Sequence, residues 1–131
     1  MKKSNHNSSE RWFEIGSNEF EFAIASLKEF GAFYPQICFQ FQQAAEKYLK
    51  GFLVYNNKRF PKIHDLSQLL KLCAKIDKDF LDYFNETAFL SQFYLIVRYP
   101  VLDYPIAEKK EALEASKYAE SIIKLVKNKI K

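Results

Sequence analysis

The sequence predicts an all-α protein, and three observations support this fold class. Glycine and proline are scarce, with 3 and 4 among 131 residues, and apolar residues recur at helical spacing over long stretches. Apolar residues make up 48% of the chain, which suffices for the core of one domain. We expect an up-and-down four-helix bundle with one additional short helix over residues 10–131, preceded by a disordered polar tail over residues 1–9.

The first helix is predicted from about Glu10 to Phe30. Ser9 can act as its N-cap, because a serine hydroxyl can accept a hydrogen bond from a free amide of the first turn. Gly31 stands where a C-terminal cap belongs. The apolar stripe of this helix includes Trp12, Ile15, Phe22, Ala23, Leu27 and Phe30.

The second helix is predicted from about Pro35 to Tyr55 and is the most clearly amphipathic segment. Asn56 and Asn57 can adopt the left-handed conformation that ends a helix. The apolar positions are Ile37, Phe41, Ala44, Ala45, Tyr48, Phe52 and Tyr55. The polar positions expected on the other side are Gln36, Gln40, Gln43, Lys47 and Lys50.

The third helix is short, and the Asp65–Gln68 spacing resembles a capping box at its start. The fourth should begin after a second N-cap candidate, Asp77, and continue to about Arg98. This fourth helix is apolar on two faces, so it needs two packing partners. We expect a homodimer with this helix at the interface, although a central position in the bundle would explain the same pattern. The interface residues expected are Phe89, Phe93, Ile96 and Val97.

Pro100 and Pro105 should interrupt the helical pattern, because proline lacks an amide proton and restricts the residue before it. The fifth helix follows and should end near Lys129, where lysines suit the negative end of the helix dipole. Its core stripe is formed by Ala112, Ala115, Ala119, Ile122, Ile123, Val126 and Ile130.

Composition limits the classes of function. Cys38 and Cys73 lie in apolar helical patterns, which favours buried reduced thiols, and no cysteine or histidine spacing suggests a metal. We expect no cofactor, no metal and no membrane segment, and a cytoplasmic location. The net charge of +4 permits contact with RNA or nucleotides without requiring it.

Three segments together resemble the HEPN domain family. Residues 39–50, Phe-Gln-Phe-Gln-Gln-Ala-Ala-Glu-Lys-Tyr-Leu-Lys, are similar to a "QAAEKxLK" helix of that family. His64-Asp65-Leu66, followed by Leu69 and Leu70, is similar to its "HDLxxLL" segment, and Arg98-Tyr99-Pro100 to its "RYP". Their order and spacing cover about residues 10–129.

The resemblance implies a helical bundle that dimerises. Many members of the family are metal-independent RNases, often toxins paired with a minimal nucleotidyltransferase, whereas others bind nucleotides or act as non-catalytic partners. In catalytic members an arginine is followed after four to six residues by a histidine, and dimerisation brings two such motifs into one cleft. Arg98 matches the arginine, but the permitted positions hold Asp103, Tyr104 and Pro105.

The motif therefore lacks its acid/base histidine. Arg98 could grip a phosphate at two points through its planar guanidinium group, and Tyr99 and Tyr104 could stack on a base. Asp103 and Tyr104 are doubtful catalytic replacements, because tyrosine is a poor base at neutral pH and facing aspartates would repel phosphate. His64 is expected to hydrogen-bond locally ahead of the third helix, and Gln42 and Gln43 to be solvated or interfacial.

Three functions remain open. The first is a dimeric protein that binds RNA or nucleotide phosphate through Arg98, Tyr99 and Tyr104, as the toxin-like partner of a minimal nucleotidyltransferase. The second is an active metal-independent endoribonuclease that uses Arg98 with Asp103 and Tyr104. The third is a non-catalytic protein-interaction module in which Arg98 only stabilises a helix end.

Overall fold

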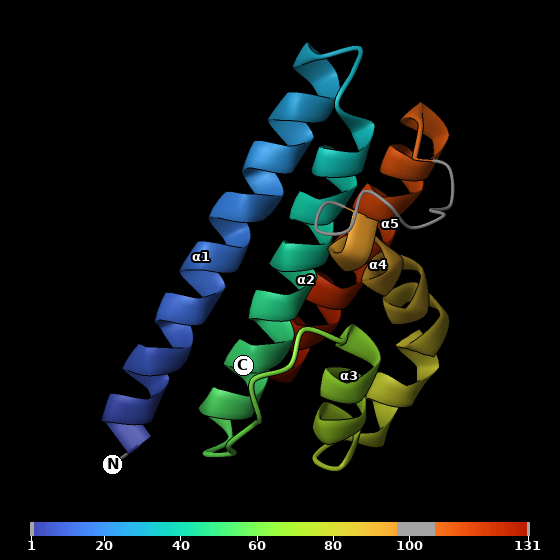
Figure 1. Ribbon diagram of the computed structural model, residues 1–131. Helices are drawn as coiled ribbons and strands as arrows, with labels where there is room; N and C mark the ends of the chain where they lie inside the picture. The colour runs from blue at the N-terminus through green and yellow to red at the C-terminus, as the bar shows by residue number, and fades with distance from the viewer. Residues whose placement is uncertain (1, 97–106, 131) are drawn as a thin grey trace.

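The computed structural model describes residues 2–96 and 107–130, and all of its regular elements in these ranges are helices. They are α1 (Lys2–Glu29), α2 (Tyr34–Tyr55), α3 (Leu66–Ala74), the 3-10 helix η1 (Lys78–Tyr83), α4 (Phe84–Ile96) and α5 (Lys109–Lys129). The four long helices and the short α3 confirm the predicted fold class (Figure 1). Within these residues, no helix is both long and apolar enough to span a membrane.

Helix α2 is the centre of the bundle and packs against α1, α3, α4 and α5 (Figure 1). Its apolar stripe is buried as predicted, because it meets neighbours on several sides. The fully buried apolar residues of α2 are Cys38, Phe41, Ala44, Ala45 and Leu49. From α5 they are joined by Ala112, Ala115, Ala119, Ile122 and Val126. The single core is therefore built around α2.

Helix α1 begins at Lys2, within the stretch predicted as a polar tail. Ser9 lies inside this helix and is buried, so it is not the N-cap. Residues 2–9 contain no glycine or proline, so nothing in this stretch breaks the helix before Glu10.

The turn between α1 and α2 differs from the predicted cap. Gly31 has no positive φ, whereas Phe33 has φ 66° in the left-handed region, an uncommon conformation for a bulky residue. Pro35 falls in the first turn of α2, as predicted. At the other end of α2, Asn57 adopts the predicted left-handed conformation with φ 60°.

Asp65 and Asp77 both act as N-caps, as predicted. Asp65 Oδ1 accepts a hydrogen bond from the Ser67 amide at 2.9 Å, and Asp77 Oδ1 accepts one from the Asp79 amide at 3.0 Å. The segment after Asp77 is the 3-10 helix η1, so the predicted fourth helix starts as a tighter turn and becomes α4 at Phe84.

Candidate functional site

The residues on which the predicted site depends lie outside the described part of the chain. They are Val97, Arg98, Tyr99, Asp103 and Tyr104. The described chain ends at Ile96 on one side of this segment and resumes at Ala107 on the other. The candidate site in the described part of the chain therefore consists of the side chains that surround the last turns of α4.

An imidazole and a phenol stack beside these last turns. The rings of His64 and Tyr94 lie 4.7 Å apart between centroids and are nearly parallel, with an interplanar angle of 13°. Tyr94 belongs to α4, whereas His64 belongs to the loop that leads into α3. The ring of Phe39 of α2 lies 6.3 Å from the Tyr94 ring. Three parts of the fold thus converge at this end of α4.

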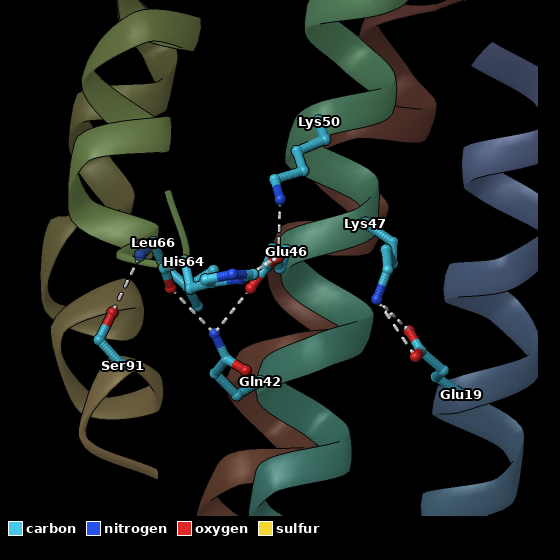
Figure 2. Close-up of polar contacts among 8 residues, drawn as sticks. All are labelled: Glu19, Gln42, Glu46, Lys47, Lys50, His64, Leu66 and Ser91. Atoms are coloured by element: carbon cyan, nitrogen blue, oxygen red, sulfur yellow. Dashed lines mark hydrogen bonds and ion pairs between the residues drawn. The ribbon is translucent and has the colours of Figure 1, made fainter. Parts of the chain in front are cut away.

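A buried carboxylate orients the imidazole. Glu46 of α2 is 1% exposed, and its Oε2 lies 3.0 Å from Nδ1 of His64 (Figure 2). Because a carboxylate accepts hydrogen bonds, this contact places the proton on Nδ1 and leaves Nε2 available to a ligand. The side chain of His64 is 44% exposed, so the imidazole ring is not enclosed by the protein.

Glu46 receives two further donors from its own helix. Lys50 Nζ lies 2.8 Å from Oε2, and Gln42 Nε2 lies 3.2 Å from Oε1 (Figure 2). Gln42 Nε2 also donates to the His64 carbonyl oxygen at 3.2 Å. Both partners of this nitrogen are acceptors, which fixes the orientation of the amide. Both oxygens of the Glu46 carboxylate are hydrogen-bonded, as a buried charge requires.

Two aromatic rings enclose the ammonium group of Lys50. Its Nζ lies 5.8 Å from the ring of Trp12 and 5.4 Å from the ring of Phe60, and these two rings meet edge to face at 5.9 Å. Cation–π attraction therefore supplements the ion pair with Glu46. Because Trp12 lies on α1, this contact links the polar cluster to the outer helix of the bundle.

The structure corrects three expectations about polar residues. His64 does not bond only locally, since its partners Glu46 and Tyr94 are far away in sequence. Gln42 is fully buried, and Lys50 is 7% exposed, so neither is a solvated surface residue. The sequence does contain one indication of this cluster. Gln42, Glu46 and Lys50 follow one another at intervals of four and so lie on one helix face.

A hollow of about 460 Å³ opens beside the stacked pair. It lies between the start of α3 and the outer side of α4, where the Leu66 amide donates to Ser91 Oγ at 3.1 Å (Figure 2). The hollow is lined by His64, Asp65, Ala88, Ser91, Gln92 and Tyr94. It is therefore a concave surface beside the last described turns of α4.

The predicted interface residues are only partly described. Phe93, one of the residues expected at the interface, is fully buried in its own chain. Phe89 is half-buried and contacts the rings of Phe93 and Tyr118 at 5.3 and 5.2 Å. The side chain of Ile96, like Val97, lies outside the description. A central position of α4 in the bundle accounts for the burial of Phe93.

Residues 2–96 and 107–130 contain no group of three histidine, cysteine or acidic side chains arranged to hold a metal ion. Burial raises the pKa of the Cys38 thiol to about 12, with a smaller contribution from Glu111, and burial raises the pKa of the Cys73 thiol as well. Neither cysteine therefore offers a ready thiolate at neutral pH.

Comparisons with known proteins agree on one family. The family model described as HEPN domain matches residues 9–129. An archaeal HEPN homologue, ST0689, has 28% identity and a TM-score of 0.76, with 94% of this chain and 98% of that chain covered. The protein TT1696 from Thermus thermophilus has 27% identity and a TM-score of 0.79 over the same shares. The comparison with curated proteins gives no match.

Proposed function

The chain belongs to the HEPN domain family, and from this premise we propose that it binds RNA or a nucleotide through a phosphate-binding cleft shared by two subunits. In this proposal the guanidinium group of Arg98 holds the phosphate. Tyr99 and Tyr104 supply aromatic surface for bases. The residues of the described cluster support the cleft from one side.

The observation that carries the proposal is the stacked pair of His64 and Tyr94 at the edge of the hollow. Arg98 follows Tyr94 by four residues, and chain geometry keeps two Cα atoms at that separation within about 14 Å. A flat aromatic surface near a bidentate phosphate binder is the combination that single-stranded nucleic acids require. The basic net charge of +4 agrees with an anionic ligand.

A binding assay tests this proposal. Fluorescence anisotropy with a labelled single-stranded RNA should show binding that Arg98→Ala weakens about tenfold or more, because one charge-assisted hydrogen-bonding group is lost. Arg11→Ala is the matched control, since it removes the same charge from an exposed position on α1. Equal affinity of Arg98→Ala and the wild type would contradict the proposal.

Metal-independent RNA cleavage is a second candidate function, favoured by the contact between His64 and Glu46. An imidazole whose Nδ1 is held by a carboxylate can accept a proton at Nε2, as a general base must. Asp103 and Tyr104 stand at positions where the family motif permits a histidine, and they are the competing candidates for the acid/base role.

Cleavage should be measured with RNA in the presence of a chelator. Loss of cleavage in both Arg98→Ala and His64→Ala would assign the acid/base role to His64. Loss in Asp103→Asn or Tyr104→Phe, with His64→Ala still active, would assign it to the motif segment. An intact RNA substrate after incubation with wild-type protein would exclude this candidate.

We further propose a minimal nucleotidyltransferase as the protein partner, with this chain as the toxin-like member of the pair. Family membership supports this partner class. Co-expression with a nucleotidyltransferase encoded beside this chain should yield a stable complex and relieve any growth defect. If the two proteins form a complex, but neither this chain alone nor the complex binds RNA or nucleotides, a non-catalytic interaction module is favoured instead.

A further inference from the structure

We propose that the hollow between α3 and α4 holds a nucleobase and prefers bases that carry an exocyclic amino group. This inference rests on the proposed binding of RNA or nucleotides and adds the class of base that is preferred. Three features carry it: a fixed aromatic surface, a rim rich in hydrogen-bond acceptors, and a local charge that disfavours phosphate.

The aromatic surface is the ring of His64. It lies parallel to the Tyr94 ring at 4.7 Å, and its side chain is 44% exposed, so part of the ring remains open to a further stacking partner. The bond from Nδ1 to the buried Glu46 prevents the ring from turning. A surface held in place before binding loses less conformational entropy when the ligand arrives.

Three of the residues that line the hollow carry acceptor atoms beyond those used in their hydrogen bonds within the chain. The side-chain amide nitrogen of Gln92 donates to the Phe89 carbonyl oxygen at 2.8 Å, which leaves Oε1 of Gln92 as an acceptor. Asp65 uses Oδ1 to accept from the Ser67 amide, which leaves Oδ2. With its proton on Nδ1, His64 offers Nε2 as a third acceptor.

Besides these three acceptors, the lining of the hollow includes one hydroxyl donor, Ser91. Ser91 Oγ accepts from the Leu66 amide, so its own proton can be donated into the hollow. An amino group, as in adenine, guanine or cytosine, supplies the donors that such a rim lacks. A carbonyl oxygen at the same place, as in hypoxanthine or uracil, would meet acceptors and leave them unpaired, which opposes binding.

The carboxylate of Asp65 also favours the base over the phosphate as the part of a nucleotide that enters the hollow. A phosphate beside Asp65 would be repelled, whereas a neutral base with an amino group would be attracted. The phosphate is therefore expected on the side of Arg98, and the base in the hollow. This division of the ligand is consistent with the proposed role of Arg98.

Adenosine and inosine monophosphate form a pair of probes of the same size, because the amino group and unprotonated N1 of the first are replaced by a carbonyl oxygen and an N1–H group in the second. Calorimetric titration of the full chain should show adenosine monophosphate binding about tenfold more tightly. Tyr94→Leu removes the ring on which His64 is stacked, and it should weaken both nucleotides about fivefold or more, because stacking on His64 does not depend on that substituent.

Asp65→Asn should bring the two affinities close together. The asparagine amide can offer either a donor or an acceptor, and asparagine remains a good N-cap, so α3 is retained. Asp82→Asn is the control, since it changes the same charge at an exposed position in η1 and should leave the ratio of affinities unchanged.

The outcomes separate this inference from the proposed function. Equal affinity of wild-type protein for the two nucleotides, or a ratio that Asp65→Asn leaves unchanged, would overturn the inference. If Arg98→Ala weakens both nucleotides while their ratio is one, only the inference fails. If the ratio is about ten but Arg98→Ala has no effect, only the role of Arg98 fails. Absence of binding by either nucleotide would overturn both.

Discussion

Glu46 joins α2 to the loop before α3 through its contact with His64, and its position makes it costly to replace. Its carboxylate is buried and pairs with Lys50 at 2.8 Å, whose side chain is itself only 8% exposed. Glu46→Ala would leave a buried ammonium group without its counter-ion. We expect the free energy of unfolding to fall by about 3–5 kcal/mol, measured by urea denaturation at pH 7.

A double variant distinguishes loss of the pair from loss of packing. Glu46→Leu combined with Lys50→Met removes both charges and keeps apolar volume in their place. Because replacing both members of a buried ion pair is often neutral, this variant should recover most of the stability lost in Glu46→Ala. If it is as unstable as Glu46→Ala, the charge imbalance is not the cause.

The two thiols predict how stability depends on alkaline pH. Burial holds the pKa of Cys38 at about 12, against 9.0 for an ordinary thiol, and also raises that of Cys73. Above pH 9.0 the unfolded chain loses these protons while the folded chain keeps them. Stability should therefore decrease as pH rises, by up to about 1.4 kcal/mol per pH unit for each thiol.

Urea denaturation between pH 8 and about pH 10.5 measures this dependence. The variant with Cys38→Ala and Cys73→Ala has lower stability throughout, because small cavities are created. Its stability should nevertheless change less steeply with pH than that of the wild type. Identical slopes would show that other groups, such as tyrosines, account for the alkaline loss.

At the residue level, the sequence predicts side chains with local roles and misses those with distant partners. Asp77 and Asn57 are examples of the first kind, since a helix cap depends on its own turn. Gln42 and His64 are examples of the second kind, because their partner Glu46 is known only once α2 and the loop before α3 have been placed together. The hollow beside Tyr94 was missed for the same reason.

At the level of elements, the contact between α1 and α2 depends on glycines at close approach. A Cβ atom on Gly51 would lie 2.4 Å from Cε1 of Phe13, so the ring would have to move. Gly51→Ala should lower the free energy of unfolding by about 1–3 kcal/mol, even though alanine favours a helix by about 1 kcal/mol.

Gly31 supplies the control for this substitution. A Cβ atom there would meet nothing within 4 Å, and its φ is not positive. Gly31→Ala should therefore leave stability unchanged or raise it by about 0.4–1 kcal/mol, since the unfolded chain becomes less flexible. Thermal or urea denaturation compares the two variants, and a Gly51→Ala protein as stable as Gly31→Ala would disprove the close contact.

The existence of each element could be predicted from periodicity, but several boundaries could not. Helix α5 ends at Lys129 as predicted, because its apolar stripe and its lysines give the same boundary. Phe33 takes the left-handed conformation in place of Gly31, because the path of the turn is set by how α1 packs on α2. The 3-10 helix η1, which packs against α3 and α4, was not predicted as a separate element.

At the level of the whole molecule, the outer face of α4 is the surface that we expect to join two subunits. Phe84 is 46% exposed, Ala88 is exposed and Gln92 is half-buried, and their spacing of four places them in one row. A two-fold contact through this row would bring the two copies of the hollow together, because Ala88 and Gln92 also line it.

Ala88→Arg places a charge at the middle of this row. Sedimentation equilibrium at micromolar concentration should show a dimer for the wild type and a monomer for this variant, because an unpaired charge in the contact opposes association. Leu113→Arg is the control, since Leu113 is 50% exposed and belongs to a different helix, α5. A monomeric wild type would exclude the shared cleft, and a dimeric Ala88→Arg would require a different interface.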